Sequence, residues 1–320
     1  PTVKTVTDYF NEGGYETAHF GFQHERHDPR ENRYMVEGSS NELRDHYCEV
    51  AFDKALAYLA ERRTAEQPFY LNIGTIETHA SRWLGRFEDD RRATYGDPTD
   101  PSGLSLPFFM PDHPTIRREW GKFEAAIRYY DRHCGRFYDG LREMGFLENS
   151  VVVFTTDHGI SGLRAKGTLY DPGVEIMTLM HLPQAEHNGR RYDELIQNMD
   201  FAPTVLDFAG LPIPEPMQGR TFKSLLEGGA YRPHERLFIE RNFHGGNYDP
   251  MRAVRTKDAH YLRNFGEDVR REWLPHEVED RIGDTFTRWL NELWPEPSDP
   301  RPAEELYLLS DDPREWTNRA

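Results

Sequence analysis

Three side chains that can bind a metal ion or an anion follow one apolar segment. Asp157 and His158 come directly after residues 150–156, and Lys166 lies further along the same run. Residues 150–156 are apolar and β-branched without a helical period, which predicts a strand covered on both faces in a parallel sheet. Ligands of open α/β sheets bind at the carboxyl ends of strands, so this placement indicates a site. The alternative, a helix-capping Asp157 before Gly159, leaves His158 and Lys166 without a role.

Two further histidines follow other predicted strands. Residues 15–22 predict a strand that leads to His24, and residues 68–74 predict another that leads to His79. An imidazole, with an ordinary pKa of about 6.5, suits proton transfer near neutral pH. Taken alone, His24 fits a surface residue equally well, and a loop histidine such as His79 is more often solvated than a ligand.

Alternating strands and helices must position these residues. Helices are predicted over residues 2–13, 42–63, 115–144 and 198–211, and further strands over 175–181, 237–240, 251–255 and 259–263. We therefore expect an α/β domain over residues 1–234 and a C-terminal α+β subdomain with an antiparallel sheet over residues 235–320. Residues 80–115 predict either an ordered loop over the active face or a plain surface excursion.

Composition excludes several classes of protein. With a net charge of -16, the chain is unsuited to general binding of nucleic acid or of anionic membranes, so any anionic substrate must meet a local cationic pocket. Cys48 and Cys134 lie far apart in the sequence, without the spacing of a metal-binding motif. We expect each to be a small, buried apolar side chain. No apolar run approaches the roughly 20 residues that span a bilayer, and we expect no signal peptide within the given residues. Localisation and oligomeric state are left open.

The run after residue 155 resembles the second signature of the sulfatase family. The matching residues are Thr156, Asp157, His158, Gly159 and the run Lys166, Gly167, Thr168, Leu169, Tyr170, Asp171, Pro172, Gly173 and Val174. Further stretches, at residues 14–24, 198–211 and 305–318, also resemble family motifs. The chain is most similar to sulfamidase-like (heparan N-sulfatase-like) members. The resemblance implies an alkaline phosphatase-like α/β fold: a mixed, mostly parallel sheet flanked by helices, with a smaller C-terminal antiparallel sheet domain.

The resemblance also implies roles for the candidate residues. Asp157 and His158 correspond to a pair that binds calcium, although that hard ion prefers oxygen to imidazole nitrogen. Lys166 and His79 correspond to residues that meet the sulfate, and His24 to a residue that handles a proton on the nucleophile. The Lys that the family carries two residues before His24 is Phe22 here.

Arg241, His244 and Arg255 have two interpretations. They line the pocket for a sulfated sugar, because Arg binds sulfate-like oxyanions through paired donors, or they form interdomain ion pairs and a solvated loop. Both interpretations fit the sequence.

The family's nucleophile is missing. Its formylglycine is made from the Cys or Ser of Cys/Ser-x-Pro-x-Arg, and neither that motif nor the family's Asp-Asp pair occurs in the chain. Both normally precede the stretch that matches residues 14–17. We therefore expect an amino-terminally truncated or split sulfatase rather than a pseudoenzyme, with formylglycine in the missing segment and no activity in the chain by itself.

Three functions follow from these observations. The first is calcium-assisted hydrolysis of sulfate esters or N-sulfated sugars, with a sulfated small molecule or glycan as substrate. The second is a non-catalytic pseudoenzyme that binds sulfated glycans. The third is hydrolysis of phosphomonoesters or phosphonates on the same fold.

Overall fold

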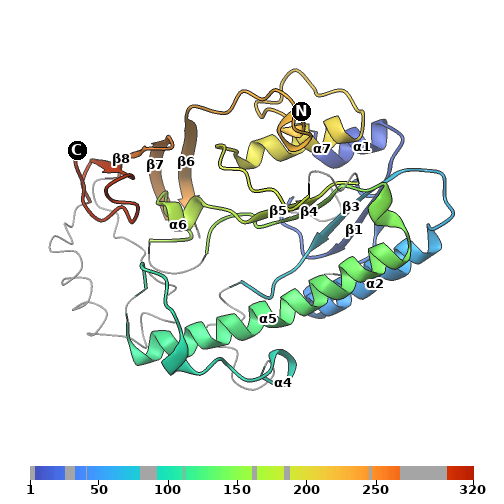
Figure 1. Cartoon of the computed structure of the whole chain (residues 1–320), viewed down its shortest axis with the longest axis horizontal. Helices are drawn as coiled ribbons and strands as arrows, with labels where there is room; N and C mark the ends of the chain where they lie inside the picture. The colour runs from blue at the N-terminus through green and yellow to red at the C-terminus, as the bar shows by residue number, and fades with distance from the viewer. Residues whose placement is uncertain are drawn as a thin grey trace.

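A layer of sheets lies between two layers of helices, and a separate antiparallel sheet stands at one side of them (Figure 1). The structure, a computed structural model, describes residues 4–25, 33–40, 42–79, 92–110, 112–160, 164–183, 188–244, 247–266 and 301–320. The family resemblance predicts this arrangement, and the structure confirms the α/β fold class with its parallel sheet and separate antiparallel sheet.

The parallel sheet has the order β2-β1-β3. Its central strand β1 (Glu16–Gly21) is almost wholly buried and pairs in parallel with β2 (Val36–Glu37) and β3 (Phe69–Gly74). The predicted strands over residues 15–22 and 68–74 are confirmed. Because β1 and β3 run in the same direction, their carboxyl ends deliver residues to one edge of the sheet.

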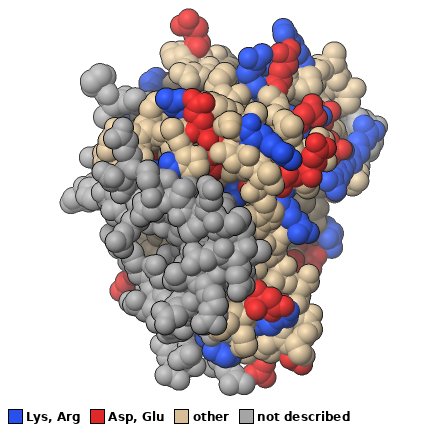
Figure 2. All heavy atoms as spheres, turned by 90° about the vertical axis from the view of Figure 1, so that its left-hand side faces the viewer, with Lys and Arg blue, Asp and Glu red and all other residues tan. Residues whose placement is uncertain are grey.

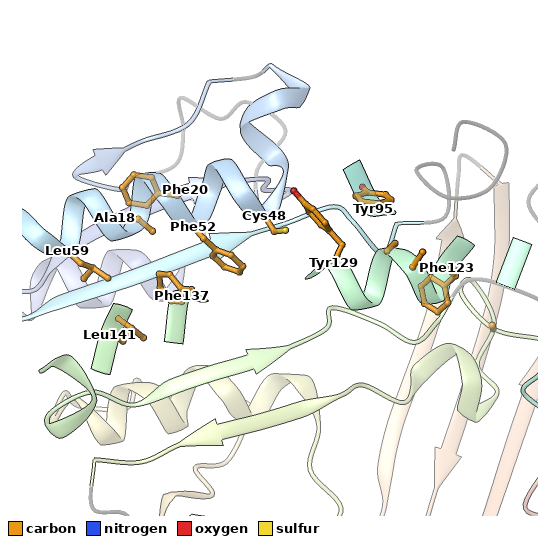
Figure 3. Close-up of a cluster of buried hydrophobic side chains, with 14 of the residues drawn as sticks. Ala18, Phe20, Cys48, Phe52, Leu59, Tyr95, Phe123, Tyr129, Phe137 and Leu141 are labelled. Atoms are coloured by element: carbon orange, nitrogen blue, oxygen red, sulfur yellow. The ribbon is translucent and has the colours of Figure 1, made fainter. Parts of the chain in front are cut away.

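Two long helices cover one face of this sheet. The predicted helix over residues 42–63 is a short η2 (Leu43–His46) followed by α2 (Cys48–Glu61), and the predicted helix over residues 115–144 is α5 (Pro114–Glu143). The apolar face of α2 packs against α5, with the Phe52 and Phe137 rings stacked at 5.0 Å (Figure 3). The hydrophobic cluster that includes Phe52 and Phe137 holds α2 and α5 against the parallel sheet. It therefore fixes the position of the sheet edge from which the loops after β1 and β3 leave.

The strand before Asp157 departs from prediction. β4 (Val152–Thr155) pairs antiparallel with β5 (Thr178–His181), and in the described part of the chain these two strands form a sheet of their own. The expected parallel pairing with burial on both faces is therefore wrong, and so is full burial of the strand predicted over residues 175–181: Leu179 is 62% exposed. A β-branched run predicts a strand but says nothing about its neighbour. β5 runs antiparallel to β4 because the chain turns back between Thr155 and Thr178, which lie opposite each other in the pair.

Helices on the other face complete the α/β part. α1 (Val6–Glu12) and α7 (Phe201–Phe208) lie on the side of the sheets opposite α5 (Figure 1). The predicted helix over residues 198–211 divides into η6 (Asn198–Asp200) and α7, and a short α8 (Lys223–Leu226) follows.

The C-terminal strands form one antiparallel sheet in the order β6-β7-β8-β9. Three were predicted, namely β6 (Leu237–His244), β7 (Asn247–Arg255) and β8 (Ala259–Asn264). The fourth, β9 (Glu304–Leu308), was recognised as a family motif but not as a strand. The domain boundary at residue 235 stays a prediction.

The segment predicted as a loop over the active face is described only in part. Residues 80–91 and 111 lie outside the described residues. The remainder includes α4 (Arg92–Tyr95) and η3 (Pro101–Gly103), with Phe109 and Met110 buried in the main core. Its role at the active face stays a prediction.

Neither a membrane-spanning helix nor a patch of one charge sign is seen in the described residues, the second on the face that Figure 2 shows. None of the described helices is long and apolar enough to cross a membrane. Figure 2 shows Lys and Arg interspersed with Asp and Glu on the described part of one face. A cationic site must therefore be local.

We predict that Leu59→Ala destabilises the chain by about 2–5 kcal/mol, because Leu59 is fully buried in α2 and its loss leaves a cavity. Denaturant unfolding followed by circular dichroism measures this. The matched Leu179→Ala on the exposed face of β5 should change stability by about 0.5 kcal/mol or less. Equal losses in the two variants would contradict the packing described here.

Candidate active site

Lys166 and His79 come from different loops and meet at one place. Lys166 Nζ lies 3.4 Å from His79 Nε2. The His79 loop leaves β3 in a tight turn, in which the His79 N–H donates to the Ile76 carbonyl at 3.1 Å. The Lys166 N–H donates to the Ile160 carbonyl at 2.8 Å, so the chain returns to the end of β4 after a short excursion. In this contact Lys166 donates and His79 Nε2 accepts, and with a proton on Nε2 the two nitrogens, 3.4 Å apart, are spaced to share one tetrahedral oxyanion.

The local electrostatics of this pair suit an anion. Lys166 is half-buried, and burial lowers the pKa of its ammonium below the ordinary value, while the nearby charge of Asp157 opposes that shift. His79 is exposed, so the pair is open to solvent on one side. A half-desolvated ammonium gains more from a bound anion than a fully solvated one does.

Gly167 lets the C-terminal sheet approach this loop. Its φ of +86° is in the left-handed region, and a Cβ there would stand 2.9 Å from His244 Nδ1. His244, at the end of β6, therefore borders the residue next to Lys166.

Asp157 and His158 present an oxygen and a nitrogen on the same side. His158 Nδ1 donates to the Gly159 carbonyl at 2.6 Å, which leaves the lone pair of the neutral ring on Nε2, 3.5 Å from Asp157 Oδ1. Two ligands about 2.4 Å from one calcium ion and at right angles to each other are separated by about 3.4 Å. The pair thus fits two positions of a cation site, and Asp157 is well exposed. Among the described residues, no third acidic group or histidine completes a cluster with them.

His24 follows β1 and is exposed. In the described part of the chain its contact is with the Phe22 ring, whose centroid lies 4.5 Å from that of His24, rather than with Lys166 or His79. The structure thus brings Lys166, His79 and Asp157 together and leaves His24 at the same edge without a contact to them.

The arginines predicted for the sugar pocket hold carboxylates. Arg255 makes a paired contact with Asp171, from Nε and Nη2, at 2.9 Å each. Arg241 pairs with Asp249 at 3.3 Å and donates to the Gly167 carbonyl. These contacts correspond to the ion-pair interpretation of Arg241 and Arg255, and they join the C-terminal sheet to the Lys166 loop. A role in sugar binding stays a prediction.

A set of four polar residues, which we call the C-terminal polar cluster, was not predicted: the buried His260 and Glu315 and the partly buried Asp171 and Arg255. His260 Nδ1 lies 2.5 Å from Glu315 Oε1 and 3.5 Å from Asp171 Oδ1, and the Asp171 N–H donates to Glu315 Oε2 at 2.9 Å. Asp171 and Glu315 belong to stretches that resemble motifs of the sulfatase family, and that resemblance could have pointed to them. Nothing in the sequence around His260 indicated its burial.

Arg164 joins the same loop to the C-terminal tail. Its side chain is almost fully buried, its guanidinium lies 3.7 Å from the Tyr170 ring centroid, and Nη2 donates to the Glu315 carbonyl at 2.6 Å. The loop that carries Lys166 is thus held at both ends, at Arg164 and at Asp171.

Comparison with known proteins places this geometry in a family. The family model described as Sulfatase matches residues 1–211, and the model described as the C-terminal region of N-sulphoglucosamine sulphohydrolase matches residues 159–273. The chain belongs to the sulfatase family.

Curated members of that family are similar along much of the chain. An ulvan-active sulfatase of Formosa agariphila is 27% identical over 320 residues, covering 85% of this chain and 51% of the relative. Human N-sulphoglucosamine sulphohydrolase is 25% identical over 219 residues, covering 65% of this chain and 42% of the relative. The chain therefore spans about half the length of these relatives or less.

Solved structures show the same fold. One neighbour, solved in complex with its substrate D-glucosamine-2-N,6-O-disulfate, has a TM-score of 0.64 at 16% identity, covering 99% of this chain and 77% of that structure. A phosphonate monoester hydrolase from Silicibacter pomeroyi also gives 0.64 at 16% identity, covering 92% and 80%. At this identity the likeness concerns the fold alone.

We predict that Glu315→Ala loosens the Lys166 loop, because the Asp171 amide and His260 lose a buried acceptor. Breaking such a pair costs about 3 kcal/mol, so amide exchange over residues 164–171 should speed up on the order of a hundredfold. Hydrogen-exchange mass spectrometry measures this. Glu304→Ala, which removes a half-exposed partner of Arg263, should leave the loop unchanged. Unchanged exchange in Glu315→Ala would contradict the role of the cluster.

We predict that Asp157→Asn lowers the pKa of Lys166 further, because it removes the charge that opposes desolvation. A folded-state pKa below the unfolded one means that stability rises with pH between the two values, and this variant widens that window downward. NMR titration of isotopically dimethylated lysines measures the pKa. Asp139→Asn, on the exposed side of α5, is the control, and an unchanged pKa in Asp157→Asn would disprove the interaction.

Proposed function

We propose that this chain provides the anion- and metal-binding part of a sulfatase-type hydrolase that acts on sulfated sugars, as O-sulfate esters or N-sulfates. The observation that carries the proposal is the 3.4 Å approach of Lys166 Nζ to His79 Nε2 in a member of the sulfatase family. Both residues were singled out from the sequence for contact with the same sulfate.

The chemistry assigned to each residue follows from its surroundings. Lys166 offsets the negative charge of the sulfate from a half-desolvated position, and His79 donates a hydrogen bond from the solvent side. Asp157 and His158 would hold calcium, which would polarise a sulfate oxygen. His24 is proposed to carry a proton at the same sheet edge. These groups bind and polarise the sulfate ester, but none of them attacks sulfur.

The nucleophile is proposed to be a formylglycine in a segment outside residues 1–320. The support is that no Cys/Ser-x-Pro-x-Arg stretch occurs in this sequence. Electrostatic stabilisation of sulfate without an attacking group gives binding and no turnover. The localisation and oligomeric state of the protein are left open.

Hydrolysis of a phosphonate or phosphomonoester is the second candidate. The phosphonate monoester hydrolase neighbours have the same fold, and a tetrahedral phosphoryl group has nearly the shape of a sulfate. A non-catalytic binder of sulfated glycans would use the same pair of donors. Binding and activity measurements separate the three.

Sulfated-sugar binding should depend on Lys166. We predict that N-sulfoglucosamine with calcium binds the chain and raises the pKa of Lys166, because the bound anion favours the charged ammonium. Lys166→Ala should weaken binding at least about tenfold, the loss of one charge-assisted contact, by isothermal titration calorimetry. Lys54→Ala, whose lysine pairs with Asp45 at the surface, is the matched control. Equal binding by both variants would remove Lys166 from the site, and tighter binding of a phosphonate would favour the second candidate.

Activity should require the additional segment. We predict that residues 1–320 do not hydrolyse an aryl sulfate or N-sulfoglucosamine, whereas a longer product of the same gene, made in a host that forms formylglycine, does so with calcium. Lys166→Ala in that product should lower the rate by removing charge that balances the sulfate. Turnover by the 320-residue chain would show that the nucleophile lies within it. Failure of the correctly modified longer protein would favour the binding function.

A further inference from the structure

One thiol and two carboxylic acids meet at the start of α2. Cys48 and Glu49 begin the helix, and Glu77 reaches them from the loop after β3. One ligand atom from each, the Cys48 thiol sulfur and one carboxylate oxygen of each Glu, lies within 4.8 Å of the other two. We propose that Cys48, Glu49 and Glu77 form a zinc-binding site that is separate from the calcium site proposed above.

Glu77 supplies the observation that distinguishes this cluster from an ordinary helix cap. Its Oε1 accepts the Cys48 N–H at 2.5 Å, which is a capping contact. Its other oxygen, Oε2, is buried without a hydrogen-bond partner among the described residues, and the whole side chain is only 1% exposed. An unpaired buried oxygen costs about 1–3 kcal/mol. Capping explains the first oxygen, and a bound cation would explain the second.

Glu77 and Cys48 both have raised pKa values. Burial raises the pKa of Glu77 to about 7, and burial together with the Glu77 carboxylate raises the pKa of the Cys48 thiol. His133 is a basic group that interacts with Glu49, and its Nδ1 is also buried without a partner among the described residues. Zinc binds a thiolate and carboxylates in their deprotonated forms, so its two positive charges would offset most of the three negative charges of this ligand set.

The donor set selects the metal. A thiolate with carboxylates suits zinc, whereas calcium and magnesium take oxygen ligands alone. Two ligands of one tetrahedral zinc are about 3.5 Å apart, so atoms that lie within 4.8 Å of one another need to approach by no more than about 1.3 Å. Glu49 is half-buried and can supply this movement. The Tyr129 hydroxyl points towards Cys48 (Figure 3) and would lie beside the bound ion.

The site would act on the proposed function through His79. Glu77 lies two residues before His79 in the same loop. Zinc held by Glu77 and by the first turn of α2 would fix that loop, and so the donor that faces Lys166. Only this consequence rests on the proposed function, because metal binding is measured without any sulfate.

Cobalt, which replaces zinc and absorbs light, tests the site in the full chain. We expect one equivalent of Co²⁺ to bind and to give a thiolate-to-cobalt charge-transfer band in the near ultraviolet that excess Ca²⁺ does not remove and Zn²⁺ does. The chain has two cysteines. The band should therefore persist in Cys134→Ala and disappear in Cys48→Ala, and Glu77→Gln should weaken Zn²⁺ binding at least about tenfold.

The outcomes separate clearly. Persistence of the band in Cys134→Ala assigns it to Cys48 even if Cys48→Ala fails to fold. Absence of the band in the unmodified chain, or its loss in Cys134→Ala, would overturn the proposal. Neither result affects sulfate binding by Lys166, so failure of the zinc site is distinguishable from failure of the proposed function.

Discussion

The arrangement of the candidate active site depends on the partly buried contact between the Asp171 carboxylate and the Arg255 guanidinium. Asp171 ends the loop that carries Lys166, and Arg255 ends strand β7 of the C-terminal sheet. His260 Nδ1 lies 3.5 Å from Asp171 Oδ1, and Glu315 Oε2 accepts the Asp171 N–H, so this end of the loop is held through both its side chain and its backbone. Such a pair contributes little net stability over an apolar contact, but removing one partner is costly, which makes the geometry specific.

This constraint gives the C-terminal sheet a role in holding the loop that carries Lys166, one of the residues proposed to contact sulfate. Arg164 at one end of the loop and Asp171 at the other are both held by residues of the C-terminal sheet or tail. Lys166 lies between them, half-buried and with its ammonium directed to His79. A long cationic side chain such as that of Lys166 loses conformational entropy when it is ordered. Because the loop is already fixed at both ends, its backbone loses less conformational entropy when an anion binds.

Sequence patterns predicted the elements whose burial is periodic or complete. β1, β3, α2 and α5 were placed correctly because their apolar spacing reflects one continuous core. The pairing of β4 was missed, because a β-branched run such as residues 152–155 is compatible with either direction and the partner is fixed by the returning chain. Motifs singled out Lys166 and His79, which the structure brings within 3.4 Å. His260 and the unpaired oxygen of Glu77 could not be predicted, since burial of an isolated polar residue is a property of the packed fold.

The central claim is that Lys166 and His79 bind one sulfate. A crystal structure of the chain with D-glucosamine-2-N,6-O-disulfate and calcium, with the sulfur atoms located by anomalous scattering, tests it most directly. The account predicts one sulfur position whose oxygens lie about 2.7–3.2 Å from both Lys166 Nζ and His79 Nε2. A sulfate bound elsewhere on the chain, with the Lys166 and His79 side chains facing only solvent, would contradict it.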